Sequence, residues 1–295
     1  MKSKKNYLKL KCNMKYTYSK MIRDLEKKVL EASLEVHAVK WMFFNSDFFC
    51  GYAHLQDEAD PQIVEKFTEM VDRYINENIP PQYILNKTFF FNYPFYVDNG
   101  CFIPRSETEQ LVEETIYRID DLFEGKSDLK IADVCCGSGA IGITLKKEID
   151  NCSVYMCDVS PEAVNITKKN AKSLGADVVV ECGDFITPIL NQKLTFDVLL
   201  CNPPYIKNSE KLSSLVVDNE PNIALFGGED GLDFYRIIFK HFDEIINDKG
   251  FMGFEFGYDQ KELLEKLVLE TFPKYKYEFL KDYNKLDRML FIYKN

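Results

Sequence analysis

Residues 133–142 have a composition and spacing that could bind a nucleotide-like ligand. The run Asp133-Val-Cys-Cys-Gly137-Ser-Gly139-Ala-Ile-Gly142 follows an apolar segment and contains G-x-G-x-x-G. Glycines at a strand-to-helix turn let the backbone approach a ligand and point amide N–H groups at it. Asp158 ends the next apolar run, where a carboxylate can accept hydrogen bonds from both hydroxyls of a ribose. The pattern indicates an adenosine-containing ligand, either a dinucleotide or S-adenosylmethionine.

Two features favour S-adenosylmethionine over a dinucleotide. Asp133 stands before the glycines, where a carboxylate can order the loop or face a cationic ligand. S-adenosylmethionine carries a sulfonium and an ammonium, whereas a dinucleotide brings a pyrophosphate that an acid would repel. The apolar run 196–201 then leads into Asn202-Pro-Pro-Tyr205, at a strand end where open parallel sheets bind their ligands.

The Asn202-Pro-Pro-Tyr205 run predicts a clamp for a planar nitrogen group. Proline has no N–H to donate and is stiff, so Pro203 and Pro204 fix the direction of their carbonyls. The Asn202 side-chain oxygen and the Pro203 carbonyl would accept the two hydrogens of an –NH2 group, beside the flat face of Tyr205. The nitrogen would then lie in line with a methyl sulfonium. We therefore predict Asn202, Pro203 and Tyr205 as catalytic residues and Asn202, Pro203, Pro204 and Tyr205 as substrate-binding residues.

The elements that must position these residues are short apolar strands alternating with amphipathic helices. We expect strands over 129–134, 153–158, 178–181, 196–201, 251–256, 275–280 and 288–293. We expect helices from about residue 108, over 140–149 and 161–173, and near 232–247 and 260–270. This alternation predicts an α/β fold, with a mostly parallel sheet covered by helices on both faces. No long helix separates the last two strands, so they should pair antiparallel at an edge.

The N-terminal part has a different texture and predicts a separate helical domain. Apolar residues recur at helical spacing from about residue 19, and Pro80-Pro81 ends the last helix near residue 79. We expect most of its aromatic residues to form its own core. The predicted organisation is a basic, partly disordered arm over 1–20, a helical substrate-recognition domain over 21–86, a β-hairpin linker over 87–106 and the ligand-binding domain over 107–295.

Charge and cysteine content limit the class of protein. The chain has 295 residues, with 37 Lys plus Arg and 47 Asp plus Glu, so its net charge is 37 − 47 = −10. Residues 1–30 carry +8 and the remainder −18, which argues against stable nucleic-acid binding. No segment approaches a membrane span, and we expect no membrane association. The nine cysteines include no C-x-x-C pair, which predicts reduced thiols, no metal site and a cytoplasmic location.

Several of the sequence motifs resemble those of a known family. The Asn202-Pro-Pro-Tyr205 run is similar to that of N-methyltransferases acting on planar amides and exocyclic base amines. The family-like segments are Pro81–Leu85, Phe102–Glu109, Glu220–Leu225, Gly227–Arg236 and Asp287-Arg288. With these in order on both sides of the glycine loop, the chain resembles the release-factor glutamine methyltransferases. The resemblance implies a Rossmann-like class I methyltransferase fold, S-adenosylmethionine as cofactor, and methylation of the glutamine in the Gly-Gly-Gln motif of peptide chain release factors.

The resemblance also implies which residues hold the cofactor. They are Cys135, Cys136, Gly137, Ser138 and Gly139 in the loop, Asp158 at the ribose, Asp184 and Phe185 near the adenine, and Asn202. The sequence departs from the family pattern at Ser106, where proline is usual, and at Cys135 and Cys136, where glycine and a small residue such as threonine are usual. Because cysteine has a Cβ and glycine does not, we expect the backbone at Cys135 to adopt a φ that a residue with a Cβ tolerates. Asn86 and Asn92 replace usual glycines, and asparagine is a common substitute where φ is positive.

Three alternatives stay open from the sequence. A methyltransferase acting on adenine N6 or guanine N2 could use the same clamp, although the acidic body disfavours it. An NAD-dependent oxidoreductase could use G-x-G-x-x-G, but a suitably placed acid or base for hydride transfer is missing. A non-catalytic protein that binds S-adenosylmethionine would not need the clamp residues.

Overall fold

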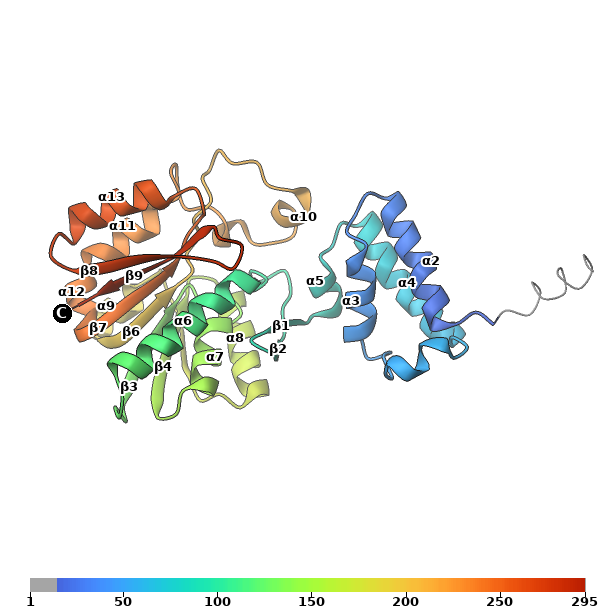
Figure 1. Ribbon diagram of the computed structural model, residues 1–295, viewed down its shortest axis with the longest axis horizontal. Coiled ribbons are helices and arrows are strands. Elements are labelled where there is room, and N and C mark those ends of the chain that lie inside the picture. Colours follow the sequence, from blue (N-terminus) through green and yellow to red (C-terminus); the bar gives the residue numbers. More distant parts are fainter. Residues whose placement is uncertain (1–14, 295) are drawn as a thin grey trace, which may run out of the picture. The chain divides into compact units, whose positions relative to one another are not determined.

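The computed structural model describes residues 15–294 and divides the chain into two units (Figure 1). Contacts within the chain assign residues 1–85 to the first unit and 86–295 to the second. The hairpin that we expected to link the domains therefore belongs with the second unit. Of the basic arm expected over 1–20, residues 1–14 lie outside the described residues, whereas residues 18–20 already belong to helix α2 (Tyr18–Glu31).

The first unit is helical, and its helix boundaries follow from local capping. Its elements are α2 (Tyr18–Glu31), α3 (His37–Asn45), the 3-10 helix η1 (Tyr52–Gln56), α4 (Pro61–Asn76) and α5 (Pro81–Leu85). Thr17 caps α2, because its side chain accepts a hydrogen bond from the backbone N–H of Lys20. Asp60 caps α4 in the same way, and Pro61 occupies the first helical turn, where its missing N–H costs nothing.

The aromatic residues of the helical unit divide into a core and an exposed group. Phe43 and Phe67 are buried and pack edge to face, with ring centroids 5.1 Å apart. Tyr52, in contrast, is 69% exposed and contacts the half-buried rings of Phe44 and Phe49. Some of the aromatic residues therefore form the core of the unit, as we expected, whereas Phe44, Phe49 and Tyr52 lie at its surface.

A short hairpin opens the second unit. Strands β1 (Thr88–Phe90) and β2 (Tyr93–Phe95) pair antiparallel, so the hairpin itself covers only part of the linker that we expected over 87–106. Asn86 and Asn92 have φ of 49° and 64°. Both lie in the left-handed region, which confirms the prediction that asparagine replaces glycine there.

A seven-stranded sheet forms the centre of the second unit. Its strands are β3 (Leu129–Val134), β4 (Cys152–Asp158), β5 (Val179–Cys182), β6 (Phe196–Cys201), β7 (Ile246–Glu255), β8 (Lys276–Lys281) and β9 (Asp287–Tyr293). They lie in the order β5-β4-β3-β6-β7-β9-β8. The pairs from β5 to β7 are parallel, and β9 pairs antiparallel with β7 and β8. The predicted α/β class and the antiparallel edge are confirmed.

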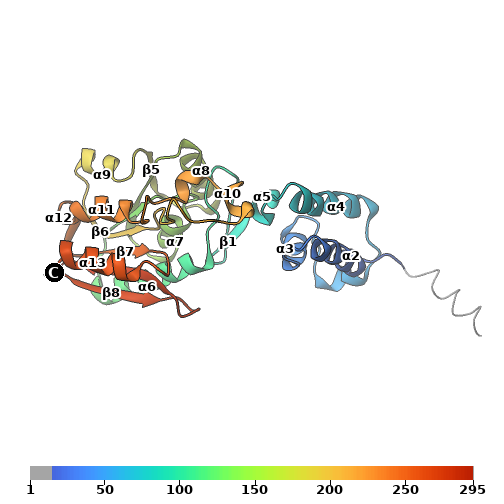
Figure 2. The ribbon, with the colours of Figure 1, turned by 90° about the horizontal axis from the view of Figure 1, so that it is seen from above.

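Helices cover both faces of this sheet (Figures 1 and 2). Side chains of α6 (Ser106–Leu122), α7 (Ala140–Glu148) and α8 (Pro161–Leu174) share one core cluster with the hairpin. The other core cluster contains side chains of α9 (Thr187–Gln192), α11 (Asp233–Lys240), α12 (Phe242–Ile245) and α13 (Lys261–Thr271). Two short helices, α10 (Ser214–Val217) and η2 (Asn222–Ala224), lie in the connection after β6. The single helix expected near 232–247 is wrong: it breaks at His241, and residue 246 already belongs to β7.

The strand register places the predicted site residues together at the carboxyl ends of three neighbouring parallel strands. Val134 pairs with Cys157 on β4 and with Cys201 on β6. The residues that directly follow these three are Cys135, Asp158 and Asn202, so all three lie in one row at the carboxyl ends of β3, β4 and β6. From β3 the chain continues to β4 on one side, and it later crosses over to β6 on the other side of β3. Open parallel sheets bind their ligands at such a point, where the strand order reverses.

Candidate active site

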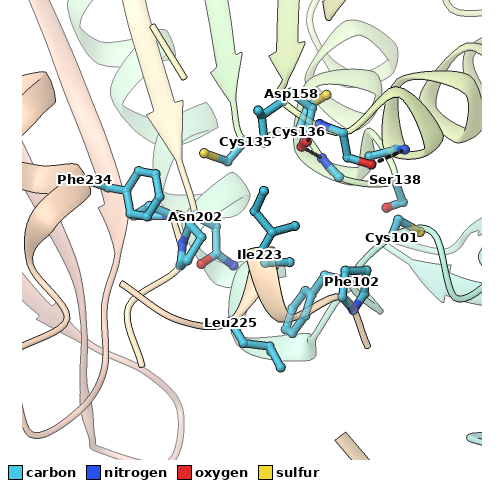
Figure 3. Close-up of a pocket in the computed structure, with 18 of the residues that line it drawn as sticks. Cys101, Phe102, Cys135, Cys136, Ser138, Asp158, Asn202, Ile223, Leu225 and Phe234 are labelled. Atoms are coloured by element: carbon cyan, nitrogen blue, oxygen red, sulfur yellow. Dashed lines mark hydrogen bonds between the residues drawn. The ribbon is translucent and has the colours of Figure 1, made fainter. Parts of the chain in front are cut away.

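A cavity of about 210 Å³ opens at this edge of the sheet (Figure 3). Its lining includes nearly all the predicted site residues: Cys135, Cys136, Gly137, Ser138, Asp158, Asp184, Phe185, Asn202, Pro203, Pro204 and Tyr205. Figure 3 shows Asp158 and Cys135 on one side of the cavity, and Phe102 and Leu225 on the other. The structure thus brings the glycine loop and the Asn202-Pro-Pro-Tyr205 run to one cavity.

Asp158 is held by backbone N–H groups at the end of β4. Gly137 donates to its Oδ2 at 2.8 Å, and Ser160 donates to its Oδ1 at 2.9 Å. Burial raises the pKa of this carboxyl, whereas the backbone hydrogen bonds oppose the rise. Each carboxylate oxygen has two lone pairs, so both can accept one further hydrogen bond from a ligand hydroxyl.

The glycines of the loop have different tasks. Gly137 has a φ of 57°, and a Cβ there would meet no protein atom within 4 Å, so its backbone faces open space in the cavity. Gly139 is absent from the cavity lining. A Cβ on it would lie 2.7 Å from Ile143 Cδ1 and 2.8 Å from Thr167 Cγ2. Gly139 therefore allows close packing at the start of α7, and the structure does not place it against a ligand as we had expected.

Cys135 adopts a backbone conformation that glycine prefers. Its φ is 61°, in the left-handed region where a Cβ is strained, so the expected Cβ-tolerant angle is wrong. Its half-buried side chain packs against the core, and its pKa is raised by a hydrogen bond with Cys201 and by burial. Cys136 is buried, with its Sγ 3.6 Å from Thr167 Oγ1.

Asp133 lies beneath the loop, fully buried. Its Oδ2 accepts a hydrogen bond of 2.9 Å from the backbone N–H of Gly142, so this carboxylate orders the start of α7. Among residues 15–294, its Oδ1 has no hydrogen-bond partner. Burial is the largest cause that raises its pKa to about 7, and the negative charge of Asp158 adds to the rise.

The Asn202-Pro-Pro-Tyr205 run is fixed at both of its polar side chains. Asn202 Nδ2 donates to Thr108 Oγ1 at 3.1 Å, and the Tyr205 hydroxyl donates to Glu255 Oε1 at 3.2 Å. Pro203 lies between them and is buried. Because the Asn202 nitrogen is engaged by Thr108, its side-chain oxygen is the atom left to accept from a ligand in the cavity.

The sequence is similar to that of known proteins over most of the chain. Residues 119–219 match the family model of the methyltransferase small domain. A release factor glutamine methyltransferase of Bacillus cereus is 38% identical over 240 residues, which cover 81% of this chain and 84% of that protein. The protein of the same name from Bacillus subtilis is 36% identical, covering 82% of this chain and 85% of its own. The chain belongs to the release factor glutamine methyltransferase family.

Solved structures show the same fold. The catalytic domain of hMettl16, in complex with MAT2A 3′UTR hairpin 1, has a TM-score of 0.52 and covers 79% of this chain and 80% of that one. Only 15% of the residues are identical, so this likeness concerns the fold alone. The Rossmann-like methyltransferase fold is confirmed. Among the described residues, no helix has the length and apolar character needed to cross a bilayer.

A methyltransferase of this family uses S-adenosylmethionine, and the cavity fits that group. Asp158 offers a carboxylate for ribose hydroxyls, and the open backbone at Gly137 lets a ligand approach. Phe185 and Phe234 supply an apolar wall, with ring centroids 5.1 Å apart. Asp133 is buried beneath the loop and is not among the lining residues of the cavity, so it orders the loop rather than facing the ligand. The dinucleotide alternative is not favoured.

The family motif at 227–236 packs against the backbone carbonyl groups of Pro204 and Tyr205 in the clamp. A Cβ on Gly227 would lie 2.3 Å from the Pro204 carbonyl oxygen, and one on Gly231 would lie 2.1 Å from that of Tyr205. Only glycine allows so close an approach. Gln260 Nε2 also donates to the Tyr205 carbonyl at 2.8 Å. The release-factor-methyltransferase motif thus fixes the path of the chain after Asn202.

A second motif pair joins the segment before α6 to the loop after β6. Glu220 is buried, and its two oxygens accept from the backbone N–H of Ile103 and from the Arg105 guanidinium. The Arg105 guanidinium also lies over the Phe102 ring, 4.5 Å from its centroid. These contacts hold Phe102 at the cavity, where it is a lining residue.

Several site residues were not predicted as such. Phe102, Ile223, Leu225 and Phe234 line the cavity, and all four belong to motifs that carried the resemblance. Membership in those motifs was the signal that could have found them. Glu255, which holds Thr108 and Tyr205, carried no signal, because it is one acid at the end of an apolar strand.

Proposed function

We propose that this protein transfers a methyl group from S-adenosylmethionine to the side-chain amide nitrogen of the glutamine in the Gly-Gly-Gln motif of peptide chain release factors. The observation that carries the proposal is the Asn202 side-chain amide beside Pro203, with its nitrogen held by Thr108, in the cavity that Asp158 and Gly137 also line. The relatives carry the name release factor glutamine methyltransferase, which supports a release factor as the substrate.

The clamp residues hold the substrate amide. The Asn202 Oδ1 and the Pro203 carbonyl accept the two amide hydrogens, while Pro203 and Pro204 keep this segment stiff. The Tyr205 ring lies beside the planar amide, and its hydroxyl is fixed by Glu255. Bound S-adenosylmethionine supplies an electrophilic methyl group on a positively charged sulfur. For that chemistry the residues Cys135 to Ser138, Asp158, Asp184, Phe185 and Asn202 would hold the methyl donor.

Positioning contributes more than proton abstraction in this mechanism. An amide nitrogen is a poor nucleophile, because its lone pair is shared with the carbonyl, and it is hard to deprotonate. Holding the nitrogen at reacting distance lowers the entropic part of the barrier. As the bond from nitrogen to the methyl group forms and the bond from sulfur to the methyl group breaks, positive charge develops on the nitrogen. Its hydrogen bonds to Asn202 and Pro203 then strengthen, and this differential stabilisation raises the rate. The methylated nitrogen afterwards gives up one of its two protons to solvent, which leaves a neutral amide.

The apolar side of the cavity excludes water from the reacting nitrogen. Phe102, Leu225 and Phe234 line it, and Leu225 is buried. In a site with little water, the dipoles of the Asn202 side chain and the Pro203 carbonyl act on the amide without competition from solvent.

We also infer that the helical unit recognises the release factor. Its exposed Tyr52, with Phe44 and Phe49, offers aromatic contact area of the kind that is enriched at protein interfaces. Residues 31–295 carry a net charge of −18. This negative charge suits a substrate factor that carries basic patches for binding ribosomal RNA.

Mass spectrometry of a release factor tests the proposal. The purified protein is incubated with S-adenosylmethionine and a release factor, and peptides are examined for one added methyl group. We expect it on the Gly-Gly-Gln glutamine and expect none when that glutamine is replaced by alanine. Parallel reactions with DNA and RNA test the amino-methyltransferase alternative. Methylation of nucleic acid without methylation of the release factor would overturn the proposal.

A further inference from the structure

Glu255 is a buried carboxylate that the clamp mechanism described so far does not use. It ends β7 and is 2% exposed. Its Oε2 accepts a hydrogen bond from Thr108 Oγ1 at 2.6 Å, and its Oε1 accepts one from the Tyr205 hydroxyl. The buried Tyr235 hydroxyl donates to its backbone carbonyl at 2.6 Å, which holds the end of β7 in place. Both carboxylate oxygens are therefore committed to side chains that touch or form the clamp.

The hydrogen bonds at Glu255 run towards its carboxylate, which is the acceptor: the Thr108 and Tyr205 hydroxyls both donate to it. Burial is the largest cause acting on the Glu255 carboxyl and raises its pKa, and the hydrogen bonds from Thr108 and Tyr205 and the positive charge of Arg288 oppose that rise. Arg288 is itself paired with Asp282, at 3.3 Å. Glu107, next to Thr108, adds a negative charge that acts the other way.

The direction of the Thr108 hydroxyl follows from counting protons. A threonine hydroxyl has one proton to donate and two lone pairs that accept. Thr108 gives its proton to Glu255, because an ionised carboxylate can only accept. Towards Asn202 the same oxygen can therefore only accept, and Asn202 Nδ2 donates to it. One hydroxyl thus decides which end of the Asn202 amide turns to Thr108.

We propose that Thr108 is a positioning residue, which Glu255 polarises so that the Asn202 side-chain oxygen, and not its nitrogen, faces the substrate amide. This inference rests on the proposed function. An Asn202 side chain turned by half a rotation would present an N–H to the N–H of the substrate, and two donors cannot bond. Without the Thr108 hydroxyl, the Asn202 side-chain amide is no longer held in the orientation that points its oxygen at the substrate. The amide of the bound glutamine then loses that oxygen as a hydrogen-bond acceptor.

Substitutions on α6 separate positioning from structural support. Thr108→Val keeps the shape of the side chain and removes the hydroxyl, whereas Thr108→Ser keeps the hydroxyl. Thr115→Val is the matched control: Thr115 is fully buried on the same helix, and its hydroxyl bonds to the Leu111 carbonyl, away from the clamp. We expect Thr108→Val to lower kcat by at least about tenfold, with the Kd for S-adenosylmethionine unchanged, and Thr108→Ser and Thr115→Val to retain most of the activity. An unchanged kcat in Thr108→Val would overturn the proposal.

A double-mutant cycle tests whether Glu255 acts through Thr108. Glu255→Gln alone weakens the acceptor for the Thr108 proton and should lower kcat. In the Thr108→Val background the same change should cost clearly less, because the hydroxyl that it polarises is gone. Fully multiplicative effects on kcat would show that Glu255 acts independently of Thr108 and would contradict this part of the proposal.

A readout without turnover separates this inference from the proposed function. In nuclear magnetic resonance spectra, the Asn202 side-chain amide is identified as the signal pair missing from Asn202→Asp. We expect one of its protons to exchange slowly with solvent in the wild type and in Thr108→Ser, and fast in Thr108→Val. Equal protection in Thr108→Val would overturn the positioning role. If the wild type shows this protection but does not methylate a release factor, the proposed function fails while the positioning of Asn202 stands.

Discussion

Gly137 and Asp158 are joined by a hydrogen bond that links the loop after β3 to the end of β4. The Gly137 N–H donates to Asp158 Oδ2 at 2.8 Å, between residues that are 21 positions apart in the chain. Ser160 holds the other oxygen, so the carboxylate has one orientation before any ligand arrives. A preorganised acceptor of this kind loses less conformational freedom when it binds ribose hydroxyls.

Asp158→Ala should therefore weaken cofactor binding. Hydrogen bonds to a charged group contribute about 1.5–3 kcal/mol each, so we expect the Kd for S-adenosylmethionine to rise by about 10- to 100-fold. Isothermal titration calorimetry measures this directly. Asp150→Ala, which removes an exposed carboxylate at the turn before β4, is the control and should bind normally. An unchanged Kd in Asp158→Ala would remove Asp158 from the cofactor site.

Asn202→Ala should act on turnover and not on cofactor affinity. The substitution deletes the oxygen that we assign to the substrate amide, and losing one such preorganised group costs about 10²- to 10³-fold in kcat. Single-turnover assays with a release factor, together with calorimetric binding of S-adenosylmethionine, separate the two effects. The exposed Asn208, just after the clamp, provides the control Asn208→Ala, which should retain kcat. Normal single-turnover rates in Asn202→Ala would rule out the clamp mechanism.

The sheet and its ligand edge could be predicted because their signals are local. Apolar runs such as 196–201 are buried along their whole length, and the turn residues after them mark the strand ends. The break at His241 could not be seen, because apolar residues continue through it, and the next strand takes over at Ile246. Periodicity alone does not separate a long helix from two short ones.

The Glu255 network could not be predicted because it depends on tertiary proximity. Thr108 meets Glu255 across 147 positions and Asn202 across 94. Asn202 belongs to a recognisable motif, but nothing in the local sequence of Thr108 or Glu255 connects either residue to it, and only the fold brings their polar atoms together. Cys135 was mispredicted for a related reason: the loop imposes a left-handed φ that the residue type does not favour.

Cys135→Gly should be at least as stable as Cys135→Ala. At ordinary positions, glycine costs about 0.5–1 kcal/mol relative to alanine, because it loses more conformational freedom on folding. At a φ of 61° the alanine Cβ is strained by about 1–2 kcal/mol, and this offsets the entropic advantage of alanine. Urea unfolding of the two variants measures the difference in the free energy of unfolding. Both lose the thiol, so its packing cancels, and an alanine variant more stable by about 0.5 kcal/mol or more would contradict the strain.

The buried Asp133 should make the stability of the cofactor-free protein depend on pH. Its pKa is raised from 3.8 to about 7 in the folded protein, mainly by burial, so between these values the folded state holds a proton that the unfolded state has lost. Its contribution to stability is therefore complete below pH 3.8 and is lost as the pH rises to about 7. We expect the free energy of unfolding of the wild type, relative to Asp133→Asn, to fall over this range by up to about 1.4 kcal/mol per pH unit. Urea unfolding at several pH values tests this, with Asp150→Asn as an exposed control that should follow the wild type. Parallel curves for the wild type and Asp133→Asn would show that Asp133 has no raised pKa.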